Sequence, residues 1–111
     1  MQMVLEELAG GITRVALDGR FDIGGAEAVD LKINVIAGTK KFVLLDMEKV
    51  TFLGSMGLRT ILTAARTVKS RGGKMAIFAP DEQIVKVLIT SGVGALLSIN
   101  PDREGAVAFL Q

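Results

Sequence analysis

The chain contains no cysteine and no histidine among its 111 residues. Without cysteine it forms no disulfide and offers no thiolate as a nucleophile or a metal ligand. Without histidine, a Ser-His-Asp triad, a histidine-ligated zinc site and a phosphohistidine relay are all excluded. A hydrolase would have to work with carboxylates or lysine alone. We therefore expect a protein that is not an enzyme and that carries no cofactor and no metal.

Aromatic residues and excess charge are also scarce. All five aromatic residues are phenylalanine and the net charge is +1, so neither base stacking nor a basic surface favours nucleic-acid binding. No apolar run approaches the ~20 residues that cross a bilayer. The first residues include Glu6 and Glu7 and no basic residue, which is unlike a signal peptide. We expect a cytoplasmic protein with no membrane insertion and no direct nucleic-acid binding.

The length and the hydrophobic pattern predict one α/β domain over residues 1–111, because no linker or repeat divides the chain. Strands are expected at Met3–Glu6, Thr13–Leu17, Lys41–Leu45, Met75–Phe78 and Leu96–Ile99. Helices are expected at Ala26–Ala37, from Ser55 to Arg71-Gly72-Gly73, from Pro80-Asp81 to Gly92, and after Asn100-Pro101-Asp102. This order predicts a small mixed, mostly parallel sheet of four or five strands with about four helices.

Three of these boundaries rest on particular residues. Residues 26–37 fit both the alternation of a strand and one face of a helix, and we favour a helix because the segment is long and Gly38 follows it. Asp18-Gly19 is expected to be the turn after the second strand. Asn100 is expected to cap the last helix, with Pro101 at its first position.

A serine among glycines, at Gly54-Ser55-Met56-Gly57, marks the change from strand to helix spacing. As an N-cap, the Ser55 hydroxyl would contribute ~1 kcal/mol, although Leu58 stands where Glu or Gln would complete a capping box. The two glycines suggest a sharp bend or the close approach of another molecule. A phosphate on Ser55 would meet unpaired helix amides and the positive end of the helix dipole. The residues favour capping and leave phosphorylation open.

Asp46, which follows the run that ends at Leu45, resembles the phosphorylated aspartate of receiver domains. Such a site also needs an adjacent acidic pair after the first strand. Asp18 and Asp22 instead flank a turn, so the residues favour a turn at a strand end for Asp46.

The segment between Gly54 and Pro80 contains five basic residues and no acidic one. The basic residues are Arg59, Arg66, Lys69, Arg71 and Lys74. This pattern has two interpretations: a solvated helix surface, or a face that docks an acidic partner.

Three segments together, Val43–Leu62, Gly19–Asp22 and Ser91–Val93, resemble the STAS domain, the family of anti-sigma factor antagonists and of the cytoplasmic tails of sulfate transporters. The family loop typically reads Asp-Ser-Ser-Gly-Leu or Ser-Ser-Ala-Gly-Leu-Arg, with an aromatic residue two positions before it, here Phe52. Gly54 stands where Asp or Ser is common, and Met56 stands where Ser, Thr or Ala is common. The resemblance implies that Ser55 is the phosphorylated residue. The partner-binding residues that it implies are Asp22, Gly54, Ser55, Met56, Gly57 and Arg59.

The resemblance implies a partner-switching module. An unphosphorylated antagonist binds an anti-sigma factor that has serine-kinase activity and a histidine-kinase-type ATPase fold. Phosphorylation of Ser55 would end that binding, and a serine phosphatase would restore it. The alternative, which Gly54 favours, is a STAS scaffold or accessory subunit of a transporter or signalling assembly that is never phosphorylated. We expect a monomer or a weak dimer, since the sequence leaves open whether Leu31 and Val35 support one.

Overall fold

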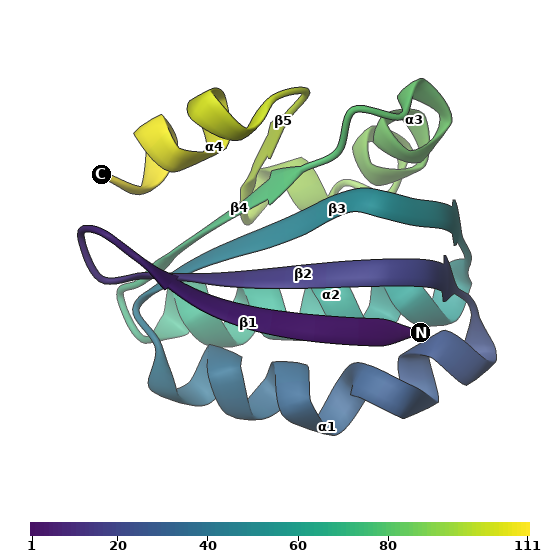
Figure 1. The fold of residues 1–111 in the computed structure, drawn as a ribbon, viewed down its shortest axis with the longest axis horizontal. Helices are drawn as coiled ribbons and strands as arrows, with labels where there is room; N and C mark the ends of the chain where they lie inside the picture. The colour runs from purple at the N-terminus through teal and green to yellow at the C-terminus, as the bar shows by residue number, and fades with distance from the viewer.

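The expected strands and helices are all present, in the expected order, in the computed structural model, which describes residues 1–111 (Figure 1). The strands are β1 (Gln2–Leu8), β2 (Ile12–Phe21), β3 (Phe42–Leu53), β4 (Lys74–Phe78) and β5 (Ser98–Asn100). The α-helices are α1 (Ile23–Thr39), α2 (Ser55–Ser70), α3 (Glu82–Thr90) and α4 (Arg103–Leu110), with a 3₁₀ turn η1 at Val93–Ala95. None of the helices combines the length and the apolar character of a membrane-spanning segment.

The five strands form one sheet in the order β1-β2-β3-β4-β5. β1 and β2 are antiparallel and are joined by a tight turn in which Gly10 and Gly11 both have positive φ, 82° and 75°, the backbone that a short hairpin requires. The other neighbouring pairs are parallel, with helices as crossovers. The prediction of a mixed, mostly parallel sheet of four or five strands is confirmed.

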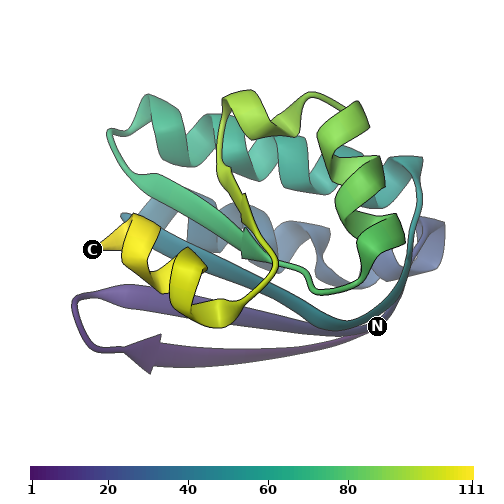
Figure 2. The same ribbon diagram turned by 90° about the horizontal axis from the view of Figure 1, so that it is seen from above.

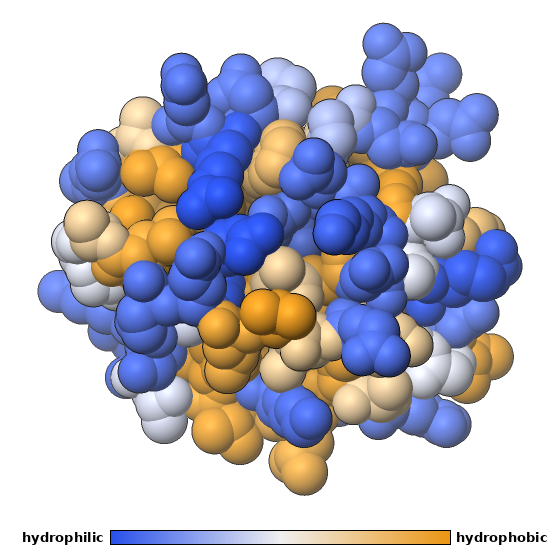
Figure 3. All heavy atoms as spheres, viewed as in Figure 1, coloured by the Kyte–Doolittle hydropathy of each residue, from blue (hydrophilic) through white to orange (hydrophobic).

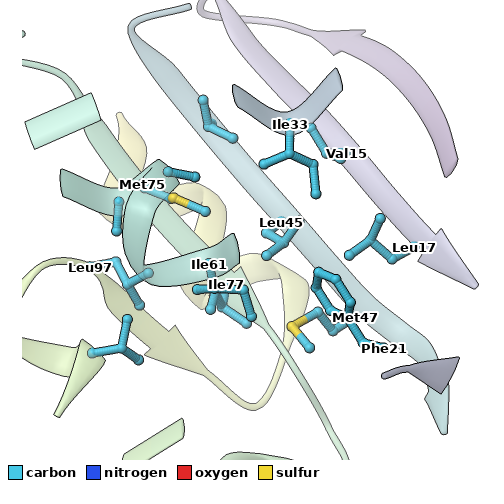
Figure 4. Close-up of a cluster of buried hydrophobic side chains, with 14 of the residues drawn as sticks. Val15, Leu17, Phe21, Ile33, Leu45, Met47, Ile61, Met75, Ile77 and Leu97 are labelled. Atoms are coloured by element: carbon cyan, nitrogen blue, oxygen red, sulfur yellow. The ribbon is translucent and has the colours of Figure 1, made fainter. Parts of the chain in front are cut away.

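Helices cover both faces of the sheet. α1, α2 and α3 contribute to a core of 24 buried residues on one face, where Leu45, Ile61 and Ile77 meet (Figure 4). α4 lies on the opposite face, as Figure 2 shows, and closes a smaller cluster of six buried residues with its Ala106 and Leu110. Successive residues of β3 serve the two faces in turn, as the period of a strand requires.

β2 and β3 are longer than the sequence predicts. β2 continues through Asp18-Gly19, which form an irregularity in the register with β3 instead of a turn, with Gly19 at φ 122°. β3 continues through Asp46, whose Oδ2 accepts a hydrogen bond from Arg14 Nε at 2.9 Å and forms an ion pair with Arg14 Nη2 at 2.8 Å. Asp46 is 3% exposed and lies inside a strand. Its assignment to a turn at a strand end was therefore wrong, and its ion pair leaves no place for a receiver-type phosphorylation site.

Three smaller expectations about boundaries were also wrong. The last strand begins at Ser98 because residues 93–95 form η1. Asp102, and not Asn100, caps α4, and its carboxylate accepts from Gly105 N–H at 2.7 Å. Helix α1 is confirmed, but it continues past Gly38 to Thr39, so that glycine is not its end.

Candidate functional site

The loops that carry Asp22 and Ser55 lie at the same edge of the sheet. β2 and β3 are parallel neighbours, and their last residues pair in register, Arg20 with Phe52 and Phe21 with Leu53. Asp22 follows β2 and caps α1, whereas Gly54 follows β3 and precedes α2. Two parallel strands and two helix N termini therefore bring together residues that are far apart in the sequence (Figure 1).

Helix α2 begins differently from the expected serine cap. Gly54 is the N-cap residue, and Ser55 is the first helical residue. Gly54 is held by its own N–H, which donates to Phe21 O at 3.0 Å, while its carbonyl accepts from Leu58 N–H at 3.0 Å. No side chain accepts a hydrogen bond from the first amides of α2. The capping interpretation of Ser55 is therefore wrong, and its side chain is exposed.

The two glycines of the loop serve the packing of α2 against β2. A Cβ on Gly57 would lie 2.6 Å from Phe21 O and 2.8 Å from Phe21 Cγ, so only glycine fits. A Cβ on Gly54 would lie 3.0 Å from the ring of Phe52. Neither glycine has positive φ. The sequence suggested either a sharp bend or the close approach of another molecule. The structure instead shows the close approach of strand β2 to Gly57, without a sharp bend.

The carboxylate of Asp22 is fixed in two ways. Oδ1 accepts from Gly25 N–H at 2.9 Å, and Oδ2 accepts from Arg20 Nε at 3.3 Å. The Gly25 amide and, less strongly, the Arg20 guanidinium lower the pKa of Asp22 below its ordinary value, because both stabilise the charged form. Arg20 also lies over the Phe52 ring, 4.4 Å from its centroid. The Arg20 guanidinium is thus held between the carboxylate of Asp22 and the ring of Phe52.

Three large apolar side chains are exposed on the elements that meet at this sheet edge. Ile23, Phe52 and Met56 are 65%, 41% and 37% exposed. Ile23 and Met56 border a hollow of about 310 Å³ between α1 and α2, together with Arg59. Arg59 also borders a second hollow, of about 240 Å³, that contains Ser55. The two hollows share Arg59 and are lined by polar as well as apolar residues, and only the second contains Ser55.

Most of the basic run is used inside the molecule. Lys69 Nζ donates to Ala95 O at 3.2 Å, and Arg71 Nη1 donates to Ala37 O at 3.1 Å. Lys74 lies 5.6 Å from the ring centroid of Phe109. These three exposed side chains are held by contacts within the chain, whereas Arg59 and Arg66, the other basic residues of α2, make no such contact. Only Arg59 borders the hollow with Ser55.

Comparison with known proteins identifies the family. A model of the STAS domain matches residues 5–106. This chain belongs to the STAS domain family. An anti-sigma factor antagonist from Mycobacterium paratuberculosis superposes with a TM-score of 0.86 at 21% identity, over 98% of this chain and 92% of that one. The phosphorylated form of the Bacillus cell fate determinant SpoIIAA superposes at 0.74, with 21% identity, over 99% and 100%. A sulfate transporter family protein from Wolinella succinogenes superposes at 0.74, with 19% identity, over 95% and 88%.

The predicted site residues of this STAS domain fall into two groups. Asp22, Gly54, Ser55, Met56 and Arg59 are exposed or half-buried near one sheet edge, whereas Gly57 is buried beneath them. Gly57 contributes by letting α2 pack closely against β2. The aromatic position that precedes the STAS loop, Phe52, orders the surface by its contact with the Arg20 guanidinium.

Sequence reasoning did not single out two residues of this surface, Arg20 and Ile23. Arg20 precedes the Asp22 cap by two positions on an extended chain, so the two side chains share a face of the strand. This spacing of opposite charges was a usable signal. Ile23 gave none, because an isoleucine at the start of a helix is ordinarily buried.

Proposed function

We propose that this STAS domain is a cytoplasmic anti-sigma factor antagonist that works by partner switching at Ser55. The observation that carries the proposal is the start of α2, where an exposed serine is the first helical residue and no side chain caps the first amides. A phosphate on Ser55 would receive hydrogen bonds from those amides and would lie at the positive end of the helix dipole. The fold would accept the phosphate without rearrangement.

The partner of the unphosphorylated form is an anti-sigma factor with serine-kinase activity and a histidine-kinase-type ATPase fold. Its contact would centre on Ile23, Phe52 and Met56, three exposed apolar side chains of the kind that anchor interfaces. A phosphate carries nearly two negative charges. In a contact that includes Ser55, the phosphate would lose much of its hydration, and the amides of α2 would balance only part of its charge, which opposes binding. A serine phosphatase would then restore the contact.

Phosphorylation is known in SpoIIAA, a distant relative, and we propose it for this chain as well. SpoIIAA has been solved in both an unphosphorylated and a phosphorylated form. The chemistry and the ATP belong to the partner, because this chain has neither histidine nor cysteine and its role is to supply a hydroxyl and a surface.

The decisive experiment is phosphorylation by the cognate kinase with ATP, followed by phosphosite mapping by mass spectrometry. We expect one phosphate on Ser55, none on Ser55→Ala, and an unchanged yield on Ser70→Ala, an exposed serine at the other end of α2. Stoichiometric label elsewhere with Ser55 untouched would contradict the proposal.

Binding of the same partner supplies an independent test. Ser55→Ala should bind like the wild type, since the hydroxyl is not required for the contact. Ser55→Asp should bind at least tenfold more weakly because a charge is desolvated in the interface. Equal affinities for the two variants would show that the site does not switch.

The alternative is a STAS scaffold or accessory subunit of a transporter or signalling assembly, which is not phosphorylated. The observation in its favour is Gly54, which leaves no acidic side chain beside the serine, together with the fold shared with a sulfate transporter family protein. It predicts co-purification with transporter components, and assembly that is unchanged by both Ser55→Ala and Ser55→Asp.

A further inference from the structure

The outward side of α1 carries an apolar row that nothing in the chain covers. Its residues are Gly24, Ala28, Leu31, Val35 and Gly38, all exposed. Leu31 is 76% exposed and Val35 is 56% exposed. The inward side of α1 is already buried against the sheet and α2. A helix that is apolar on both sides is typical of one that is buried on both sides. Hydrophobic residues accordingly appear along the lower edge of Figure 3, where α1 lies in Figure 1.

The spacing of this row is that of a coiled-coil seam. Steps of four, three, four and three residues place Ala28 and Val35 at a positions and Gly24, Leu31 and Gly38 at d positions. In a parallel coiled coil, a β-branched residue at a with leucine at d favours two strands. The small residues let two helix backbones approach closely, and a Cβ at Gly38 would meet no atom of the chain within 4 Å.

The charges that flank the row fit the same arrangement. Glu27 falls at a g position and Lys32 at the following e position, five residues later. In a parallel pair of helices, g of one helix faces e of the next heptad of the other, so Glu27 would pair with Lys32 of a second copy, twice by symmetry. In an antiparallel pair, g positions face g positions and e positions face e positions, so Glu27 and Lys32 would not pair. Neither residue takes part in an ion pair within the chain.

The remaining acidic residue of α1 serves a different contact. Asp30 faces α2 and accepts from Thr60 Oγ1 at 2.8 Å and from Asn34 Nδ2 at 3.3 Å. The helix thus has one carboxylate committed to the interior of the domain. Glu27, which also borders the hollow between α1 and α2, and Lys32 have no ion-pair partner within the chain.

We propose that a second copy of this chain covers this face, by a parallel two-fold pairing of α1 with its counterpart. The seam spans only about two heptads. It therefore buries less surface than the ~1,600 Å² of a standard stable interface, so the dimer is weak and depends on concentration. Because the start of α1 lies at the sheet edge that carries Ser55, the parallel pairing places both Ser55 loops at the same end of the dimer. The pairing does not depend on phosphorylation, so it stands or falls separately from the proposed function.

The first test is sedimentation equilibrium of the full chain from micromolar to millimolar concentrations. The wild type should show a monomer–dimer equilibrium that Leu31→Glu weakens by more than tenfold. Ile89→Glu is the matched control, because Ile89 is an exposed apolar residue of α3, 63% exposed, and its replacement should leave the dimer intact. A wild type that stays monomeric at millimolar concentration, or equal loss in both variants, would overturn the proposal.

A charge exchange tests the identity of the ion pair. Glu27→Lys and Lys32→Glu should each weaken the dimer several-fold, since each brings like charges together. The double variant Glu27→Lys/Lys32→Glu should recover the wild-type dissociation constant. Both positions are exposed, and a thermal melt checks that each variant is folded. A double variant as weak as the single ones would overturn the assigned pairing.

The direction of the helices is tested by disulfide formation, which is unambiguous in a chain without cysteine. Ala28→Cys and Gly38→Cys lie about 15 Å apart along the helix. In a parallel dimer each faces its own counterpart, so both variants should form disulfide-linked dimers under oxidation. In an antiparallel dimer at most one of them lies at the two-fold axis. Linkage of one variant alone, or of neither, would overturn the parallel arrangement.

Discussion

The N terminus of α2 differs from those of α1, α3 and α4 in the group that meets its first amides. At the other three helices an aspartate side chain, from Asp22, Asp81 or Asp102, accepts one or two of these N–H groups at 2.7 to 3.1 Å. At α2 the cap is Gly54, which has no side chain. A carboxylate cap already fills the place where another anion would bind. Only the start of α2 therefore has first amides that no carboxylate occupies, and it is also the start with the exposed serine.

Gly57→Ala should have the largest effect, because it removes the packing that positions α2 in the absence of a side-chain cap. The new methyl group would collide with Phe21 O, and we expect a loss of about 2–3 kcal/mol in the free energy of unfolding. Urea unfolding measures it. Gly38→Ala is the matched control within a helix: its Cβ meets nothing, so it should be neutral or stabilising by up to ~1 kcal/mol. A Gly57→Ala variant as stable as the wild type would contradict the close packing.

Asp22→Ala should have the next largest effect, because it converts a capped helix start into an uncapped one. We expect the free energy of unfolding to fall near neutral pH, because the Gly25 amide loses its side-chain acceptor. Since the pKa of Asp22 is lowered from its ordinary 3.8 by the Gly25 amide, the stabilisation is fully present above that value. It is lost as the pH falls through the lowered pKa. The difference from the wild type should therefore narrow below pH ~4. A difference that stays constant down to pH ~2 would show that the carboxylate charge contributes nothing.

The sequence predicted the elements far better than their limits, and the misses share a cause. Asp46 looks like the end of a strand until its partner is known, and that partner, Arg14, lies 32 residues earlier. Ser55 looks like a cap until Phe21 is seen to bind the amide of Gly54 and so make the glycine the cap. Local pattern contains no information about either partner. Helix periodicity, by contrast, is local, and α1 was assigned correctly even though Gly38 is not its end.

The candidate site was predictable to the extent that it follows from the sheet. Asp22 and Ser55 were recognised as separate motifs, and parallel pairing of β2 with β3 brings them to one edge. Composition does not show which cations bind carbonyl groups of the chain, as Lys69 and Arg71 do. A charge count describes a segment of the sequence. A docking surface depends on which charged side chains remain free to contact a partner after folding.

Ser55→Glu tests whether the available helix start favours an anion in the isolated domain. A carboxylate in the first turn should stabilise the fold by ~0.3–1 kcal/mol at low salt through the helix dipole. Ser70→Glu, at the last residue of the same helix, meets the opposite end of the dipole and should destabilise the fold by a similar amount. Both changes should shrink in concentrated salt. Equal shifts of the same sign at the two positions would exclude a dipole effect.

Gly54→Asp has the smallest expected effect and bears most directly on the comparison, because it gives α2 the cap that the other helices have. Replacing a glycine cap by aspartate should stabilise the fold by a few tenths of a kcal/mol, after the exposed Phe52 ring moves away from the new Cβ. The informative measurement is whether the effects of Gly54→Asp and Ser55→Glu on the free energy of unfolding add up. Once a carboxylate accepts the first amides, a second one loses its partners and meets a like charge, so the gain from Ser55→Glu should disappear in the double variant. Gly54→Asn, a cap without charge, should remove less of that gain. Full additivity of Gly54→Asp and Ser55→Glu in chemical unfolding would mean that the two positions do not share the same amides, and the contrast between α2 and the other three helices would lose its functional meaning.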